Sequence, residues 1–162
     1  MKRERVTIHQ AKLLKQLGFD EKCSGYVWNW ESDHIERIYE VTTLSNYNSS
    51  NFIKTFSVPT VDQAIDWLRK KYNIIIYHTH VPYVCPKTRK IVYSFAPKIC
   101  NPKWGWNHRI LLKRGIQSAD IYAAKRSAIT IALNWILSQK SKKSKNNKKL
   151  SKHGPKSKNN NQ

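Results

Sequence analysis

Acidic residues are nearly missing from the second part of this 162-residue chain. Residues 67–162 contain 22 basic residues and one acidic residue, Asp120, whereas residues 1–66 contain 8 basic and 9 acidic residues. The first part is therefore close to neutral, and the second is a polycation. Such an asymmetry is typical of proteins that bind nucleic acid or another anionic surface.

Cysteine is scarce, and long apolar runs are absent. Cys23, Cys85 and Cys100 are odd in number and include no close pair, which indicates free thiols in a reducing compartment rather than a disulfide framework. No apolar stretch follows the basic N-terminal residues, so we expect no secretory signal or membrane anchor. No run approaches the roughly 18 apolar residues of a membrane span. These absences favour a soluble intracellular protein without membrane contact.

Helix starts are the clearest local features that the sequence does contain. A capping-box pattern, Thr followed three positions later by Gln, occurs at Thr7 and again at Thr60. It predicts one helix over residues 8–17 and a second over 61–72. A long third helix is predicted from Ser118, where apolar residues begin to recur at steps of three and four.

Segments with alternating or β-branched residues predict strands between these helices, at residues 26–30, 35–41, 74–77 and 91–95. Residues 52–58 are expected to form a short extended segment. The strand at 74–77 is expected to be central in its sheet. Residues 42–51 and 97–117 are expected to be irregular. The order of elements predicts an α+β fold, with a small antiparallel or mixed sheet and about three helices packed on it.

The composition changes abruptly after Leu137. Residues 138–162 contain nine lysines and no acidic residue, and Leu150 is their only sizeable apolar residue. Such a segment buries too little apolar surface to offset its ordering entropy, so we expect a disordered basic tail. The predicted organisation is a compact domain over residues 1–137 and a lysine-rich tail over 138–162.

Two blocks, AKLLKQLGFDEKCSGY and VPTVDQAIDWLRKKYNIIIY, resemble a family of small uncharacterised proteins from phages and mobile elements of gut Bacteroidetes. The last helix, with ALNWIL, matches that family in general character only. The shared features are capping and core residues, so the resemblance brings no activity with it. It implies a phage origin and the bacterial host cytoplasm as location. The long basic tail departs from the usual short members.

The basic residues carry the strongest functional prediction. Tail lysines spaced every two or three residues bind phosphates through counterion release, although an acidic protein, another polyanion or a solubilising role are alternatives. Tryptophans between cations in the 97–117 loop can stack on bases, or can instead fill the edge of the core. The residues expected to bind nucleic acid are Lys87, Arg89, Lys90, Lys98, Lys103, Trp104, Trp106, Arg109, Lys113, Arg114, Lys140, Lys142, Lys143, Lys145, Lys148, Lys149 and Lys152.

Tyr26, Trp28 and Trp30 share one face of a predicted strand. Several single-strand binders stack bases on an exposed aromatic face of this kind. The opposite face offers only Val27 and Asn29, however. We therefore expect the three aromatic residues to be buried.

Metal binding has weak support in the sequence. His78 and His80 lie on one side of a predicted strand, with Cys85 and Cys100 downstream. Their spacing matches no zinc pattern and lacks the close cysteine pair of most structural sites. We expect no metal and no other cofactor.

Catalysis has no better support. Asp62 and Asp66 lie one helical turn apart, but acidic residues early in a helix are expected from the helix dipole alone. The chain contains no Gly-rich phosphate loop, no G-x-S-x-G and no H-E-x-x-H. The sequence therefore predicts a protein that is not an enzyme.

The function that we expect is that of a non-catalytic phage accessory protein, which binds DNA or RNA largely without sequence preference through its basic C-terminal half and tail. The alternative is a structural or cargo component of the phage particle, contacting packaged genome or capsid and tail proteins. A host protein is a third candidate partner. The expected location is the host cytoplasm, with packaging in the virion left open.

Overall fold

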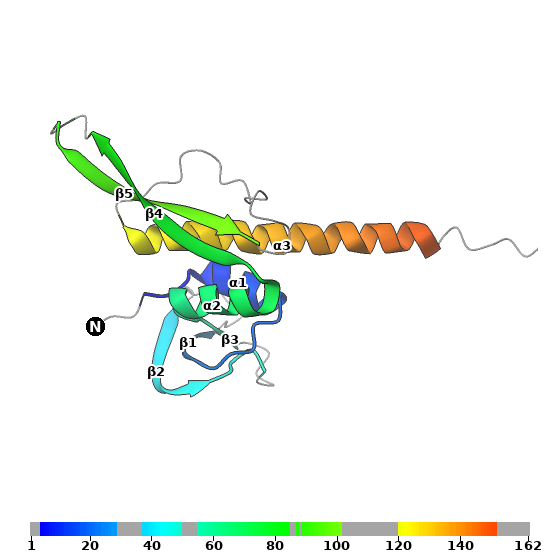
Figure 1. Cartoon of the computed structure of the whole chain (residues 1–162). Coiled ribbons are helices and arrows are strands. Elements are labelled where there is room, and N and C mark those ends of the chain that lie inside the picture. Colours follow the sequence, from blue (N-terminus) through cyan, green and yellow to red (C-terminus); the bar gives the residue numbers. More distant parts are fainter. Residues whose placement is uncertain are drawn as a thin grey trace, which may run out of the picture.

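In a computed structural model of the chain, the described residues are 4–28, 37–49, 55–84, 87, 89–101 and 120–151; side chains are not described at 83, 92 and 145–151. These residues form three helices and two antiparallel sheets (Figure 1). The elements are α1 (Ile8–Gln16), β1 (Cys23–Trp28), β2 (Ile38–Ser45), β3 (Thr55–Ser57), α2 (Val61–Tyr72), β4 (Ile75–Val84), β5 (Ile91–Cys100) and α3 (Ile121–Ser151). The predicted α+β class is confirmed, but the strands form two sheets instead of one.

Both predicted capping boxes are complete. The backbone N–H of Gln10 donates to Thr7 Oγ1 at 3.2 Å, and the backbone N–H of Thr7 donates to Gln10 Oε1 at 2.9 Å. Thr60 and Gln63 make the same two bonds at the start of α2, at 3.2 and 3.0 Å. Helix α2 ends at Asn73, whose backbone is left-handed with φ 56° and ψ 35°. The local signals of the sequence therefore place these helices correctly.

The first sheet has the strand order β2-β1-β3, with β1 antiparallel to both neighbours. β1 begins at Cys23, earlier than predicted, because its first residues are small and show no alternation of size. β2 runs to Ser45 and so extends into the predicted loop 42–51. All but two of its residues are exposed, so burial leaves no clear pattern in its sequence.

The second sheet is a long hairpin of β4 and β5, ten residues each. Its register runs without a break from Ile75 opposite Cys100 to Val84 opposite Ile91. The strands pass through Pro82 and Pro97, where the sequence predicts loops. Within the described residues each strand has one partner, and an edge strand tolerates proline because its outward N–H needs no acceptor. The prediction of a central strand at 74–77 is wrong, because β4 has β5 as its one partner within the described residues and is therefore an edge strand.

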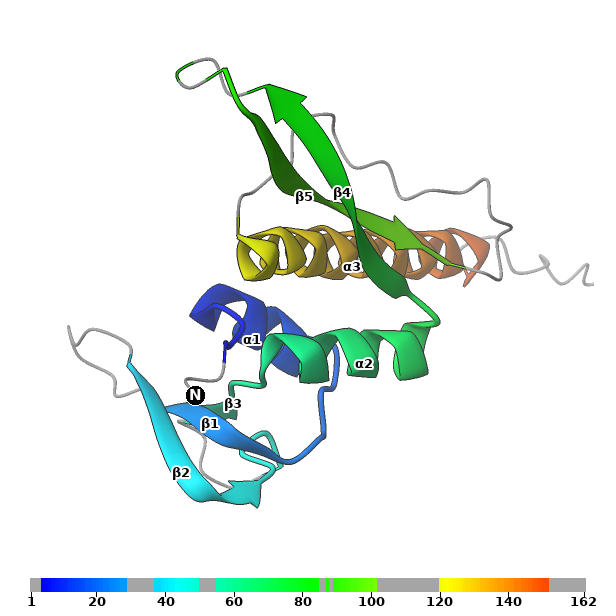
Figure 2. The ribbon, with the colours of Figure 1, turned by 60° about the vertical axis from the view of Figure 1, so that its left-hand side comes forward.

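Helix α3 lies between the hairpin on one side and α1 with α2 on the other (Figure 2). The sheet of β1, β2 and β3 lies beyond α1 and α2, away from the hairpin. The core is one cluster in which the three helices meet the base of the hairpin on one side and the inner side of β1 and β3 on the other. Its largest fully buried side chains include Phe19, Leu14, Leu68, Ile74, Ile99, Ile129 and Leu133.

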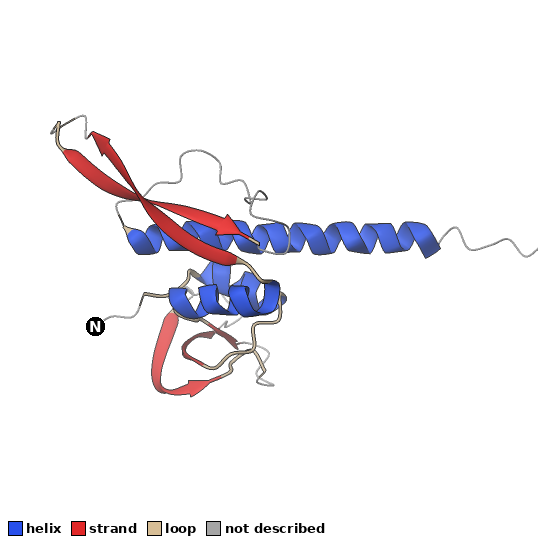
Figure 3. Cartoon of the chain, in the orientation of Figure 1, coloured by secondary structure: helices blue, strands red, loops and turns tan. Residues whose placement is uncertain are grey.

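Helix α3 projects well past the rest of the fold (Figure 3). Its last buried residue is Ile136, and Leu137 packs at the edge of the core. The packed part thus ends where the composition changes, whereas the helical backbone continues to Ser151. Lysine and glutamine favour helix, and no glycine or proline interrupts the segment before residue 154. No helix in the described part of the chain is both long and apolar enough to cross a membrane.

Candidate nucleic-acid interface

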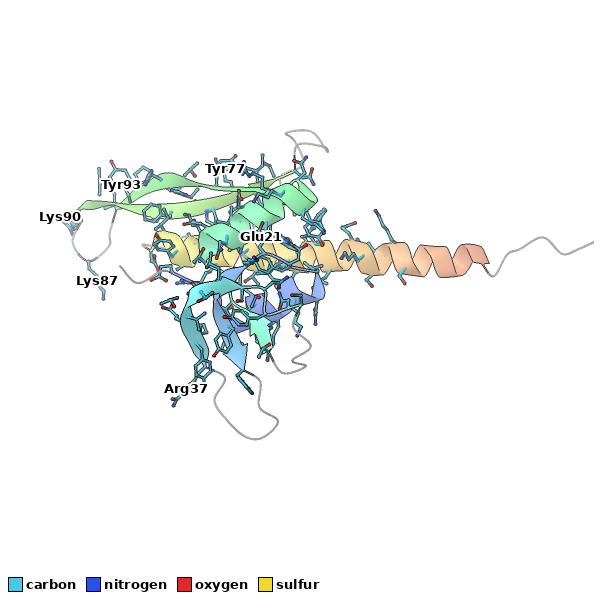
Figure 4. All side chains as sticks on the ribbon, turned by 90° about the horizontal axis from the view of Figure 1, so that it is seen from below. Glu21, Arg37, Tyr77, Lys87, Lys90 and Tyr93 are labelled. Atoms are coloured by element: carbon cyan, nitrogen blue, oxygen red, sulfur yellow. The ribbon has the colours of Figure 1, made fainter. Side chains whose placement is uncertain are left out.

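The turn of the β4–β5 hairpin carries three of the predicted binding residues. Lys87, Arg89 and Lys90 are all exposed. Lys87 and Lys90 lie at the tip of the hairpin, with Tyr93 and Tyr77 further along it (Figure 4). Arg89 has a left-handed backbone, with φ 54°. Lys98, near the base of β5, is half-buried and lies opposite Tyr77.

Large apolar side chains are exposed next to these cations. Val84, Ile91 and Tyr93 are 61%, 66% and 63% exposed, and Tyr77 is 43% exposed. The sequence alone does not indicate that these residues lie at the surface, because β-branched and aromatic side chains suit a buried strand equally well. The exposure of Val84, Ile91 and Tyr93 follows from the projection of the hairpin beyond the start of α3 (Figures 1 and 2), whereas Tyr77 lies near the base on the other face of the hairpin.

The end of α3 presents a second set of predicted cations. Lys140, Lys142 and Lys143 are exposed, and the ammonium group of Lys140 lies 5.8 Å from the ring centroid of Tyr72. Lys145, Lys148 and Lys149 continue the same helix. The predicted residues Lys103, Trp104, Trp106, Arg109, Lys113, Arg114 and Lys152 lie outside the described residues.

The two sets of cations do not lie beside each other. The hairpin turn projects past the N-terminal end of α3, whereas Lys140, Lys142 and Lys143 lie toward its C-terminal end (Figure 1). Between Ile121 and Lys142 the helix rises about 30 Å, at 1.5 Å per residue. The basic residues that were predicted to form one binding surface therefore lie in two separate regions of the structure.

The outer face of the first sheet shows that the predicted burial of the aromatic residues of β1 is wrong. Val27 is fully buried, whereas Trp28, on the other face of β1, is 45% exposed. Tyr26, next to it on that outer face, is half-buried, and its ring stacks on those of Tyr39 and Tyr47, with centroid distances of 5.4 and 4.6 Å. The aromatic residues are therefore not core residues, and Trp30 lies outside the described residues.

The reason for this reversal is the close packing on the inner face of β1. Cys23 and Gly25 are buried on that face together with Val27. A Cβ added at Gly25 would lie 2.7 Å from the carbonyl oxygen of Val58, so only small side chains fit there. The size of the side chains therefore does not predict which face of β1 is buried. The larger residues point outward because the inner side has no room for them.

His78 and His80 share one face of β4, as predicted. Both contact the ring of Phe95, with centroid distances of 5.5 and 5.1 Å. Cys100 is buried and lies on the other face of the hairpin, opposite Ile75, and Cys85 lies outside the described residues. Within the described ranges, no three His, Cys, Asp or Glu side chains are grouped closely enough to hold a metal ion.

The two carboxylates of α2 form ion pairs. Asp62 accepts a hydrogen bond from Lys125 of α3 at 2.9 Å, and Asp66 pairs with both Lys70 and Arg69. The hydrogen bond from Lys70, followed by that from Arg69, lowers the pKa of Asp66 below its ordinary value. A carboxylate with a lowered pKa is a weaker proton acceptor, so this geometry favours a structural role for Asp66.

Comparison with known proteins gives no relative: no family model, no curated protein and no solved structure matches the chain.

Proposed function

We propose that this protein binds nucleic acid without catalysing a reaction and largely without sequence preference. The observation that carries this proposal is the exposure of Lys87, Arg89 and Lys90 at the end of a projecting hairpin. Residues 67–119 contain no acidic residue at all, so all the charged side chains of the hairpin and of the sequence on either side of it are positive. Such a region attracts phosphates from a distance and releases their counterions on binding.

The separation of the two basic regions supports contacts at two points on one nucleic acid. Because the hairpin turn projects past the N-terminal end of α3, the two regions lie more than about 30 Å apart along the helix axis, so a bound duplex would have to span about one turn, about 34 Å, or more. Linking two weak sites in one molecule raises the overall affinity, provided that both can be occupied at once. In this proposal, the hairpin turn and the lysines that follow Leu137 both contribute to the affinity for one nucleic acid.

The setting of this function rests on the sequence resemblance. It favours a phage accessory protein that acts in the cytoplasm of a bacterial host. The phage genome or its transcripts would then be the available nucleic acid.

The test is a fluorescence titration of the full-length protein with single-stranded DNA, duplex DNA, RNA and polyglutamate at about 50 and 200 mM salt. We expect micromolar or tighter binding to nucleic acid, ahead of polyglutamate, with a log–log salt slope steeper than about −3. Deleting residues 138–162 should weaken binding sharply and flatten that slope. Absent binding, or equal competition by polyglutamate, would overturn the proposal.

Two charge variants assign the binding regions. K87Q/R89Q/K90Q removes the cations of the hairpin turn, and K140Q/K142Q/K143Q removes those of α3. Each should weaken binding and reduce the salt slope, by up to about 0.9 for each phosphate that the variant no longer neutralises. The control K12Q/K22Q/R37Q lowers the net charge equally at exposed residues of the near-neutral part. If the control weakens binding as much as the other two, the effect is one of net charge, and neither region is a site.

A second candidate, a component of the phage particle, is favoured by the exposure of β2. Ile38, Tyr39 and Leu44 are exposed on this strand, which belongs to the near-neutral part of the chain. Within the described residues its one strand partner is β1, so an outer edge is open to another protein. Mass spectrometry of purified particles tests this candidate, and absence of the protein from them would exclude it.

A further inference from the structure

The two ends of the β4–β5 hairpin differ in how one of its faces is covered. Cross-strand partners share a face, and faces alternate along each strand. The pair Ile76 and Ile99 and the pair Val84 and Ile91 therefore lie on the same face. Near the base this face packs into the core, where Ile99 is 2% exposed. At the tip, Val84 and Ile91 are more than 60% exposed, because the hairpin has passed the N-terminal end of α3.

We call this exposed part, made of Pro82, Val84, Ile91 and Tyr93, the arm face. It is bordered by the cations of the turn, at positions 87, 89 and 90. A second copy of the chain is a poor occupant for the arm face, since it would bring the same three cations against each other. A partner that is anionic at its rim and apolar further in is complementary to both features.

We infer that the hairpin is an arm that enters the major groove of duplex DNA, with Val84 and Ile91 facing the base edges and the turn cations on flanking phosphates. This inference rests on the proposed nucleic-acid binding and names its substrate as B-form duplex DNA. A two-stranded ribbon fits the major groove, which is about 12 Å wide. The apolar groups that base pairs present there are the thymine methyls, which aliphatic side chains contact. The major groove of duplex RNA is too narrow and deep for such an arm.

The first measurement needs no protein variant. The wild-type protein is titrated with a fluorescein-labelled A·T-rich duplex, with the same duplex carrying deoxyuridine for thymidine, and with a duplex RNA of the same sequence. Deoxyuridine removes only the methyl group, so charge and groove width stay nearly unchanged. We expect the dissociation constant to rise about threefold or more without the methyls, and the RNA duplex to bind more weakly still. Equal binding to both DNA duplexes overturns the inference.

The second measurement uses V84T/I91T, which keeps β-branched side chains but makes the arm face more polar. Because both residues are mostly exposed, the melting temperature should stay within about 2 °C of the wild type. Affinity for the thymidine duplex should fall about five- to twentyfold with an unchanged salt slope, and the difference in affinity between the thymidine and deoxyuridine duplexes should become smaller, since only the threonine methyls remain to contact thymine. The matched control is L44T, which alters a similarly exposed aliphatic residue of the other sheet. It should change neither the affinity for the thymidine duplex nor the difference in affinity between the thymidine and deoxyuridine duplexes.

The outcomes separate the two proposals. If wild-type protein binds no nucleic acid, the proposed function fails. If it binds but V84T/I91T binds equally well, the function stands and the arm inference fails. The inference also fails if V84T/I91T retains DNA binding and instead loses binding to phosphatidylserine–phosphatidylcholine vesicles, because the arm face would then bind lipid.

Discussion

Gly25 lies so close to Arg5 that a Cβ at position 25 would be 2.4 Å from Nη1 of the guanidinium group. The same Cβ would lie 2.7 Å from the backbone oxygen of Val58, which cannot move as a side chain can. The inner side of β1 is thus closed by the N-terminal segment and by the residues after β3. The absence of a side chain at position 25 is what allows these three segments to meet.

Gly25→Ala should therefore lower the free energy of unfolding by about 2 kcal/mol or more, as overpacking of a closed site does. Urea denaturation followed by circular dichroism measures this. Gly18→Ala is the control: Gly18 has φ +84° and nothing within 4 Å of its added Cβ, so only backbone strain of about 1 kcal/mol applies. A smaller loss for Gly25→Ala than for Gly18→Ala would contradict the packing described here.

Arg5 itself is held by three hydrogen bonds. Its side chain is 7% exposed and donates to Glu40 Oε1, to the backbone oxygen of Val58 and to Ser24 Oγ, each at 2.9 Å. Arg5→Gln should cost about 2–4 kcal/mol of unfolding free energy, because two buried acceptors, the backbone oxygen of Val58 and Ser24 Oγ, lose their donor at once. Chemical denaturation gives the value.

Glu40→Gln isolates the ionic contribution to that cost. The Glu40 carboxylate is 57% exposed, so the substitution should cost less than about 1 kcal/mol. If Glu40→Gln were as harmful as Arg5→Gln, the ion pair would dominate, and the bonds to Val58 and Ser24 would contribute little.

The sequence predicts helix boundaries well here because the signals are local. Thr7 and Thr60, each with a glutamine three positions later, are bonded within their own turn, and Asn73 adopts the left-handed backbone that ends α2. Chain segments far apart in the sequence decide the strands instead. β1 faces inward with its small residues because Arg5 and Val58 lie against it, and neither is near it in the sequence.

In the candidate site, too, some features follow from the local sequence and others depend on segments that are distant in the sequence. The exposure of Lys87, Arg89 and Lys90 follows from a basic turn sequence and could be predicted. The exposure of Val84 and Ile91 could not, because it depends on where α3 begins relative to the hairpin. Likewise, the charge asymmetry is visible in the sequence, but the distance between the two basic regions is set by α3.

Asp66 gives the fold a pH dependence with a definite sign. Its pKa is lowered in the folded state, chiefly by the hydrogen bond from Lys70, so its contribution to stability is present above the ordinary pKa of 3.8 and is lost as pH falls below it. Asp66→Asn should therefore narrow the stability difference between about pH 6 and pH 3. Since the pair is exposed, the effect should be small and should shrink in about 1 M salt.

The contribution of Lys70 to stability depends on pH in the opposite direction. The hydrogen bond to Asp66, followed by that to Glu21, raises the pKa of Lys70 above 10.5, so its contribution is present below that pH and is lost as the pH rises above the folded-state pKa. Lys70→Gln should reduce the free energy of unfolding at about pH 7, and this deficit should shrink only as the pH rises above the raised pKa of Lys70. Urea denaturation curves at several pH values measure both variants. A variant whose deficit did not depend on pH would indicate a packing effect.

Gln10 joins α1 to α3 as well as capping α1. Its side chain is 1% exposed; Oε1 accepts from the backbone of Thr7, and Nε2 donates to the backbone oxygen of Arg126 and, at 2.7 Å, to Thr130 Oγ1. Gln10→Leu keeps the volume but removes all three bonds, so we expect a loss of about 2–4 kcal/mol in unfolding free energy. Gln63 caps α2 in the same way but is half-exposed, so Gln63→Leu should cost about 1 kcal/mol. Gln63 Nε2 also donates to the backbone oxygen of Lys22 at 3.3 Å, so the difference between the two variants, measured by urea denaturation, gives a lower bound on the contribution of the buried bonds to α3. Equal losses would mean that α1 is held to α3 by apolar packing alone.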